Sequence, residues 1–328
     1  MTQKLPLVSV VLSFRNEELV IPELIRRLSA ALTPLPIDFE LIFVNDASTD
    51  RSLPILIEKS QADQRIKIIN MSRRFGVSEC VLAGMQFATG DAVVYLDADL
   101  QDPPELIPQL IEKWQAGADV VHTTRSKREG ESALKLILTD TAYHFIGAWA
   151  DIPLLSETGD FKLLSRRAVN ELLQLQERTP YLRGLVSWVG FNQVSVAYTR
   201  EARAAGVTKF PLFRNLLHDL GNLRGPVGTM IIGLTSFSLL PITIFLLFGS
   251  ALCLMAFVLL LIFVIWALAQ PSFAGWLWLL PVMLMLSGFQ LIGIGVLGIY
   301  LGRVYQDVRG RPRYIVESKI GFGDTSQS

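Results

Sequence analysis

The chain has 328 residues, of which 51% are hydrophobic and 18% are charged. Its 30 basic and 30 acidic side chains cancel, so bulk charge gives no reason to expect a nucleic-acid partner. Two cysteines, Cys80 and Cys253, are too few for a disulfide framework or a zinc site and indicate a reducing compartment. The length allows one domain of about 200 residues together with an apolar segment.

The first hundred residues alternate between short apolar runs and segments with helical spacing. The apolar stretch after residue 4 has no small-residue cleavage site, so it predicts a strand rather than a signal peptide. This alternation predicts a mostly parallel sheet with helices on both faces. Strands are expected at 7–13, 39–44, 66–70, 92–96 and 119–123, and helices at 17–32, after 50 up to 59, and at 76–88.

An acidic run, Asp97-Ala98-Asp99-Leu100-Gln101, follows the fourth predicted strand. Pro103 and Pro104 stop the strand and favour the start of a helix. Alternate residues of an extended chain point the same way, so Asp97, Asp99 and Gln101 would present oxygens to one point. That arrangement suits Mg²⁺ or Mn²⁺. The alternative is that the acids cap the helix that starts near Pro104.

Polar side chains also end or follow the other predicted strands. Ligands of open α/β sheets bind beyond the carboxyl ends of the strands, so these residues would surround one crevice. Each of them alone is equally well explained as a helix cap or a solvated loop, whereas together they describe a site for a nucleotide diphosphate and a metal. They are Ser13, Arg15, Asn16 and Glu17 at the first strand, Asn45 and Asp46 at the second, and Arg74 at the third.

The C-terminal third contains a long uncharged segment. From Gly225 to Gly302 there is no Asp, Glu, Lys, Arg or His, and a helix of about 20 apolar residues crosses a bilayer. We predict a leading segment at 226–240 and spans at 242–268 and 277–301. Basic residues flank both ends, which predicts cytoplasmic flanks and an outward hairpin tip. The alternative to two spans is a hairpin buried in a soluble protein. Separately, the segment 213–220 is expected to form a helix that lies on the membrane surface.

Five runs of the chain carry a family resemblance, and together they span nearly its whole length. They resemble the motif series of family 2 glycosyltransferases that act on polyprenyl phosphate, of the dolichol-phosphate mannose synthase type. The two-span C-terminal arrangement is most similar to bacterial bactoprenol-phosphate glucosyltransferases. The runs are Val8–Leu12 with Asn16-Glu17-Glu18, Val44–Asp50, Leu96–Glu105, Thr158–Leu164 and Arg203–Lys209.

The resemblance implies an α/β fold, with a GT-A (Rossmann-like) cytoplasmic domain and a C-terminal transmembrane hairpin. The implied division is a catalytic domain at 1–209, interfacial helices at 210–240, two spans at 241–303 and a cytoplasmic tail at 304–328. The implied reaction is inverting transfer of a sugar, with UDP-glucose as the expected donor, to undecaprenyl phosphate at the bacterial inner membrane. One alternative is the same reaction with another sugar nucleotide. A second is a processive polysaccharide synthase, but the Q-x-x-R-W motif typical of those enzymes is missing from this sequence. A third is a non-catalytic membrane protein that binds or translocates lipid-linked sugar.

The resemblance also implies roles for residues. It assigns the metal to Asp97, Asp99 and Gln101, and catalysis to Asp160 together with Asp97 and Asp99. A lipid phosphate is already ionised at neutral pH, so we expect Asp160 to orient substrates or stabilise developing positive charge rather than to act as a strong base. The chain has Ser13-Phe14-Arg15 where the family often has Pro-Val-Tyr. Nucleotide-sugar contacts are expected from Ser13, Arg15, Glu17, Asp46, Arg74 and Asp97.

Cations are needed to hold two acidic substrates together. Arg125 and Arg128 follow the strand at 119–123 and could clamp a phosphate, although a solvated loop is the alternative. Arg203, Thr208 and Lys209 precede the apolar segment and are expected at the lipid phosphate, although basic residues flank many membrane spans. Small residues in the second span, Gly288, Gly293, Gly295 and Gly298, permit close helix contacts within one hairpin or in a homo-oligomer.

Overall fold

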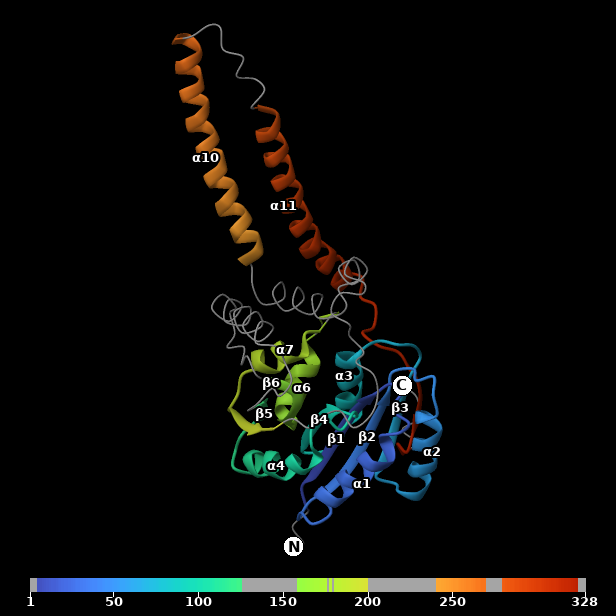
Figure 1. Ribbon diagram of the computed structural model, residues 1–328. Helices are drawn as coiled ribbons and strands as arrows, with labels where there is room; N and C mark the ends of the chain where they lie inside the picture. Colours follow the sequence, from blue (N-terminus) through green and yellow to red (C-terminus); the bar gives the residue numbers. More distant parts are fainter. Residues whose placement is uncertain are drawn as a thin grey trace.

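The computed structural model describes residues 5–125, 158–175, 177–178, 180–199, 240–269 and 279–323. The expectations for Arg128, Arg203, Thr208, Lys209 and the segment 213–220 lie outside these residues. The described chain forms an eight-stranded sheet with the strand order β7-β5-β6-β4-β1-β2-β3-β8. Two long apolar helices extend away from the sheet and its covering helices (Figure 1).

Four parallel strands form the half of the sheet that the alternating pattern predicted. In the register, Ser13 of the first strand lies opposite Val44 of the second and Asp97 of the fourth, so their carboxyl ends share one edge. The first helix begins at Ile21 rather than at residue 17, and Pro22 occupies its first turn, where proline is favoured. The elements are β1 (Leu7–Phe14), α1 (Ile21–Leu32), β2 (Asp38–Asn45), α2 (Ser52–Ala62), β3 (Ile66–Met71), α3 (Val77–Phe87) and β4 (Ala92–Asp97).

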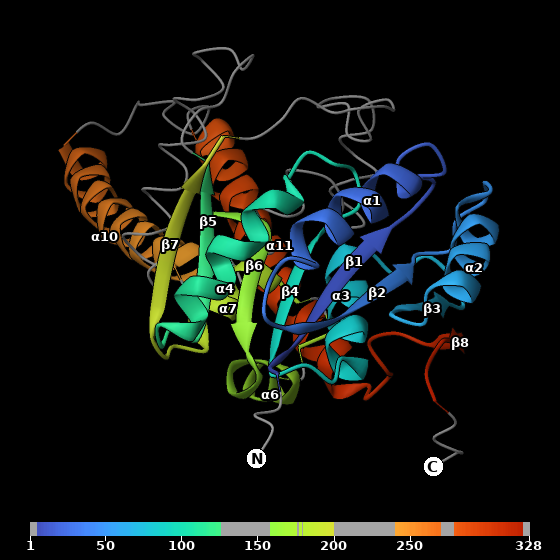
Figure 2. The ribbon, with the colours of Figure 1, turned by 90° about the horizontal axis from the view of Figure 1, so that it is seen from below.

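The remaining strands make the sheet mixed. β6 (Thr158–Ser165) lies antiparallel between β4 and β5 (Val120–Arg125), and β7 (Gln193–Tyr198) is parallel to β5. β8 (Val316–Ile320) returns from the C-terminal segment and pairs antiparallel with β3 (Figure 2). The sequence pattern placed these residues in a tail, whereas they cover the edge of β3 that would otherwise be open to pairing.

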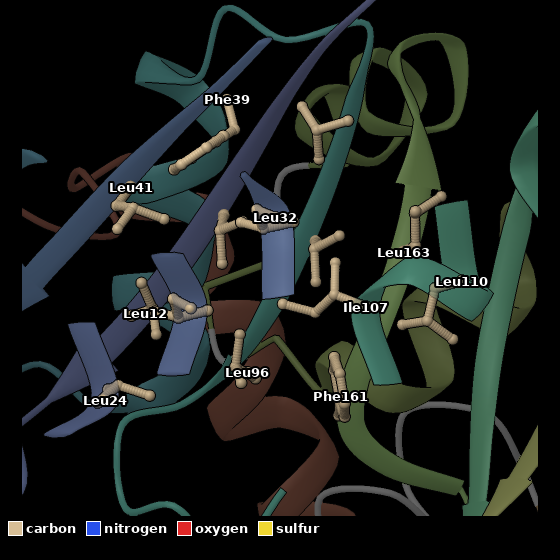
Figure 3. Packing of buried hydrophobic residues seen from close by; sticks show 14 of the residues in the cluster. Leu12, Leu24, Leu32, Phe39, Leu41, Leu96, Ile107, Leu110, Phe161 and Leu163 are labelled. Carbon is tan, nitrogen blue, oxygen red and sulfur yellow. The ribbon is translucent and has the colours of Figure 1, made fainter. Parts of the chain in front are cut away.

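Helices cover both faces of the sheet and bury its apolar side chains. α1 and α4 (Ile107–Gln115), which follows a short 3₁₀ turn at Pro104–Leu106, cover one face. α3, α6 (Arg166–Gln174) and α7 (Leu182–Trp188) cover the other (Figure 2). On the first face, strand residues pack against helix residues, as Figure 3 shows for Leu12, Leu96, Phe161, Leu163, Leu24, Leu32, Ile107 and Leu110. Full burial of each such side chain contributes about 1.5–3 kcal/mol, which keeps the carboxyl edge of the sheet rigid.

The helices α10 (Leu240–Ala269) and α11 (Leu279–Val308) are each long and apolar enough to cross a membrane. They lie side by side (Figure 1), and Phe289 of α11 contacts Phe245 and Phe248 of α10 at ring-centroid distances of 5.2 and 4.8 Å. A Cβ on Gly293 would lie 3.4 Å from Phe245, whereas Gly288, Gly295 and Gly298 face open space. Large apolar side chains elsewhere on both helices are exposed, for example Leu254 at 67% and Leu291 at 69%.

Close packing of α3 on the sheet gives a testable prediction at Gly84. A Cβ there would lie 2.3 Å from Cγ1 of Val11 and 3.2 Å from Cγ2 of Val44. We expect Gly84→Ala to lower the free energy of unfolding by about 1–3 kcal/mol through overpacking. Thermal unfolding of the full chain in detergent measures this. Gly249→Ala, a matched change in α10 with open space around it, should leave the midpoint unchanged; equal midpoints for both variants would contradict the packing described.

Candidate active site

The loops that follow β1 and β2 are tied together by side chains. Nη1 of Arg15 donates hydrogen bonds to the carbonyl oxygens of Asp46 at 2.7 Å and Ala47 at 2.8 Å. The backbone N–H of Thr49 donates to Oδ1 of Asn16 at 2.8 Å. The backbone N–H of Glu17 donates to the hydroxyl of Ser52 at 2.8 Å. Arg15, expected at the nucleotide, therefore has a structural role that the sequence did not indicate.

Asp46 joins the loop after β3 to this arrangement. Its Oδ1 accepts hydrogen bonds from the backbone N–H groups of Phe75 at 2.6 Å and Gly76 at 3.3 Å. The buried thiol of Cys80 lies beneath it, and burial together with the Asp46 carboxylate raises the pKa of that thiol. Arg74, in the same loop, is exposed. Asp46, at the end of β2, is thus bonded to the loops that follow β1 and β3. The side chain of Arg74 remains accessible to a ligand.

Backbone strain gathers at the same edge of the sheet. Among the described residues, four that are not glycine have positive φ, and three of them follow β1, β2 and β4: Asn16 at 56°, Ala47 at 52° and Leu100 at 57°. Such conformations cost on the order of 1–2 kcal/mol each, and the hydrogen bonds between the loops offset this cost. Strained residues concentrate at binding and catalytic sites, so this edge is the candidate site.

Four carboxylates crowd the end of β4. The hydroxyl of Ser13 donates to Oδ1 of Asp97 at 3.2 Å. Burial, together with the negative charges of Asp160, Asp99 and Asp102, raises the pKa of Asp97 to about 7. Asp99 and Asp102 are themselves buried. Burial and the nearby like charges disfavour the ionised form of Asp97, and a cation bound beside it would favour that form.

The path of the chain after Asp97 differs from the expectation. β4 ends there, Leu100 adopts positive φ, and Oδ1 of Asp99 accepts the backbone N–H of Gln101 at 3.1 Å. The prediction that 97–101 stays extended is therefore wrong, because the chain turns. The Gln101 side chain makes no hydrogen bond within the described chain. Pro103, the residue before the 3₁₀ turn at Pro104–Leu106, provides no side-chain cap to that turn.

The donor set still fits a divalent cation of a particular kind. In the part of the chain that the structure describes, no three His, Cys, Asp or Glu side chains form a ready-made metal cage. Mg²⁺ is commonly held by one or two carboxylates, with substrate phosphates completing its coordination. Asp97 and Asp99 match that arrangement. Asp102 serves another purpose, since it accepts a hydrogen bond from the hydroxyl of Tyr198 in β7.

Asp160, at the start of β6, is held by a two-pronged ion pair with Arg183 of α7. Nε of Arg183 donates to Oδ1 of Asp160 at 2.7 Å, and Nη2 donates to Oδ2. The pair fixes the orientation of the carboxylate. No motif in the sequence pointed to Arg183, because α7 supplies it from a separate segment. The effect of Asp160 on Asp97 places the predicted catalytic and metal carboxylates in one site.

A row of buried polar residues lies behind the carboxylates. The register pairs Lys162 of β6 with Tyr95 of β4 and His122 of β5. The Tyr95 hydroxyl, Nζ of Lys162 and Nδ1 of His122 are buried, and none has a hydrogen-bond partner within the described ranges. Burial lowers the pKa of Lys162 to about 7, and burial with the Lys162 charge lowers that of His122 to about 4. Lys162, a lysine inside an apolar strand, is the one positive group of this row.

Arg125 ends β5, so its backbone lies in the described sheet, but the position of its side chain is outside the description. His122 of β5 lies in the core, where its Nε2 meets Oε1 of Gln193 at 2.8 Å.

Comparisons with known proteins agree with this site. The glycosyl transferase family 2 model matches residues 9–173. The uncharacterized glycosyltransferase YkcC of Bacillus subtilis is 41% identical over 96% of this chain and 94% of its own length. The bactoprenol glucosyl transferase of Shigella phage SfX is 35% identical over 95% and 99%. A glucosyl-3-phosphoglycerate synthase structure from Mycobacterium tuberculosis covers 70% of this chain and 80% of its own at 20% identity, with a TM-score of 0.46, too low to assign a function.

The mixed sheet is GT-A-like, and the matched region contains β2, β3, β4 and the Asp97, Asp99 and Asp160 carboxylates. The family match covers half of the chain, and the two curated relatives match nearly all of it. The chain therefore belongs to glycosyl transferase family 2, and it is a glycosyltransferase enzyme.

Proposed function

We propose that this enzyme transfers a sugar from a nucleotide diphosphate to polyprenyl phosphate, with a divalent cation at Asp97 and Asp99. The observation that carries the proposal is the gathering of carboxylates at the end of β4, where burial and the negative charges of Asp160, Asp99 and Asp102 raise the pKa of Asp97 to about 7. The names of the bactoprenol glucosyl transferases support glucose as the sugar and a bactoprenol lipid as the acceptor, for which we propose undecaprenyl phosphate. UDP-glucose is the donor that the family resemblance implies.

The donor would lie along the edge formed by the carboxyl ends of β1 to β4. Asp97 and Asp99 would hold Mg²⁺ or Mn²⁺, which when bound neutralises the charge on the departing diphosphate. Ser13 orients Asp97 through its hydroxyl. Arg15 and Asp46 keep the loops in place, and the accessible side chain of Arg74 is available to the diphosphate. Glu17 is also proposed to contact the nucleotide sugar.

The acceptor supplies the nucleophile. An oxygen of the lipid phosphate forms a bond to the anomeric carbon while the bond from that carbon to the nucleotide diphosphate breaks, with inversion. The nucleophile is already anionic, so no strong base is needed. Asp160, fixed by Arg183, would hold the sugar or acceptor in line and stabilise positive charge at the anomeric carbon. Arg125, Arg128, Arg203, Thr208 and Lys209 are proposed to bind the lipid phosphate.

The apolar helices would bring this site to its lipid substrate. We assign α10 and α11 to a membrane-spanning hairpin, because both expose large apolar side chains and neither carries a charged residue before Arg303. Their 30 residues each correspond to about 45 Å, enough to cross a bilayer with some tilt. Basic residues on both sides of the pair favour a cytoplasmic catalytic domain and cytoplasmic termini, in the bacterial inner membrane.

The proposed function is tested by incubating membranes that contain the full chain with undecaprenyl phosphate and a panel of labelled sugar nucleotides, with and without chelator. We expect labelled lipid from UDP-glucose, and loss of this product when the chelator removes the cation. A labelled lipid formed from a different donor would revise the identity of the transferred sugar and leave the proposed reaction unchanged. Failure to form a labelled lipid from any donor would overturn the proposal.

The metal assignment predicts that Asp97→Asn and Asp99→Asn each reduce kcat/KM by about 100-fold or more, because each removes charge from the cation site. Initial rates over a range of Mn²⁺ concentrations measure this, and the concentration needed for half-maximal rate should rise. The matched control is Asp38→Asn, an exposed carboxylate at the other end of β2. Equal rates for Asp38→Asn and Asp97→Asn would contradict the assignment.

The raised pKa of Asp97 predicts a pH effect on stability when no cation is bound. Between the ordinary pKa near 4 and the folded pKa of about 7, the folded protein binds a proton that the unfolded chain releases. The free energy of unfolding should therefore fall as the pH rises through this range. Thermal unfolding of chelator-treated protein at pH 5 and pH 8 measures the fall, which should be smaller in Asp97→Asn; an undiminished fall in that variant would exclude Asp97 as its source.

The role of Asp160 predicts a specific pH–rate profile. Asp160→Asn should lower kcat by about 100-fold through lost electrostatic stabilisation, yet keep the titration limbs of the wild type, because no proton is taken by this carboxylate. Arg183→Gln should lower kcat in the same direction by releasing the Asp160 side chain. If Asp160→Asn instead loses a limb that the wild type shows, Asp160 acts as a base.

A further inference from the structure

A cavity lies away from the carboxylate site. It has a volume of about 470 Å³ and lies between the C-terminal end of α11, with the segment that follows it, and the helices α3 and α6. This volume is within the usual range of small-molecule sites. None of the residues assigned to the sugar-transfer site lines it. Figure 1 shows the C-terminal end of α11 continuing into the segment that leads to β8.

The lining of this cavity is positively charged. Arg178, Arg311 and Arg313 line it, and Asp307 is the one acidic residue among its lining residues. Arg178 comes from the connection between α6 and α7, so the charge is assembled from separate parts of the chain. A guanidinium group offers several N–H donors in a planar fork that matches the oxygens of a phosphate. The cavity therefore has the composition of an anion site.

Arg178 is held in place by the last turn of α11 and by the segment that follows it. Its backbone N–H donates to Oδ1 of Asp307 at 3.1 Å, and its Nη1 donates to the carbonyl oxygen of Arg311 at 2.8 Å. These bonds use one guanidinium nitrogen. Nε and Nη2 have no partner in the described parts of the chain, so they remain able to donate to a ligand.

Arg313 is partly buried without an opposite charge in contact. Burial lowers its pKa, and although Glu177 acts on its charge, no ion pair joins the two within the described residues. Arg311 is exposed, and its side chain forms no bond to another residue that the structure describes. Partly burying an unpaired cation is costly, and an anion bound between the arginines would remove that cost. Apolar side chains, among them Phe87 and Leu173, complete the wall.

General attraction of basic residues to a membrane surface does not explain this arrangement. Basic side chains that flank a span, or that follow the C-terminal end of a helix, are expected to be exposed. Arg309 fits that description, since it is exposed and lies over the ring of Tyr305. Arg313 is instead partly buried, and Arg178 comes from a helix connection that is far from α11 in the sequence although it contacts that helix. Arg178 and Arg313 therefore indicate a binding site that the fold assembles from separate segments of the chain.

We propose that this arginine-lined cavity binds a phosphate group, supplied by the headgroup of an anionic phospholipid or by a free phosphate ion. Bound phosphate would fix the segment 309–315, which joins α11 to β8, and so set the catalytic domain against the end of the helix. The inference goes beyond the proposed sugar transfer and uses a different set of residues, so either can fail without the other.

The test uses the purified full chain in a neutral detergent. Thermal unfolding is followed while phosphatidylglycerol, phosphatidylcholine or inorganic phosphate is added. We expect phosphatidylglycerol or inorganic phosphate to raise Tm in a saturable way, and phosphatidylcholine to have no effect. The two probes identify the source of the phosphate group. A rise in Tm that only phosphatidylglycerol produces indicates a lipid headgroup. A rise that inorganic phosphate also produces, and that is not additive with the rise from phosphatidylglycerol, indicates that the free ion binds at the same site.

Variants distinguish a built site from surface charge. The double variant Arg311→Gln with Arg313→Gln should weaken the apparent affinity by about tenfold or more, because it removes two charge-assisted contacts. Arg309→Gln removes the same kind of charge from the same segment but does not line the cavity, so it should bind as the wild type does. Equal weakening by Arg309→Gln, or no saturable shift with either probe in the wild type, would overturn the proposal.

A measurement on the wild type covers the case in which the double variant does not fold. Hydrogen–deuterium exchange of the full chain should show slower exchange of the segment 309–315 when the probe that raises Tm is present. The exposed helix α2 should exchange at the same rate with and without that probe. Unchanged exchange in 309–315 would contradict binding at this cavity.

Discussion

The constraint around which the site is built is the crowding of four carboxylates, Asp97, Asp99, Asp102 and Asp160, at the end of β4. Burial raises the pKa of Asp97 to about 7, and the negative charges of the other three add to this rise. Ser13 and Arg183 orient two of the carboxylates, and the buried Lys162 lies opposite Tyr95 of β4. Burying ionisable groups together costs stability, and under the proposed function a cation bound with the diphosphate would reduce that cost.

The surrounding fold makes this arrangement rigid. The apolar layers on both faces of the sheet fix the strand ends, and the loops between them are locked by Arg15, Asn16 and Asp46 in conformations that include residues with positive φ. The C-terminal segment adds β8 to the same sheet, so the chain that leaves the apolar helices is part of the catalytic domain. The candidate site at the carboxyl edge and the two apolar helices are thereby linked through one sheet.

Much of this could be predicted from residue patterns, because those patterns are local. Apolar runs and helical spacing located β1 to β4 and the two long helices, and the acidic run before Pro103 marked the site. The antiparallel β6 and β8 could not be predicted, because strand pairing depends on contacts distant in sequence. Arg183 and Lys162 were missed for the same reason, and the turn at Leu100 depends on a backbone conformation that a leucine rarely adopts.

The central claim is that Asp97 and Asp99 hold the cation that bridges to the diphosphate. The most direct measurement is the anomalous-scattering map of crystals of the full chain grown with Mn²⁺ and UDP. The account predicts one Mn²⁺ peak at coordination distance, about 2–2.4 Å, from carboxylate oxygens of Asp97 or Asp99 and from the diphosphate. A Mn²⁺ peak on the diphosphate with neither carboxylate in its coordination sphere would contradict it.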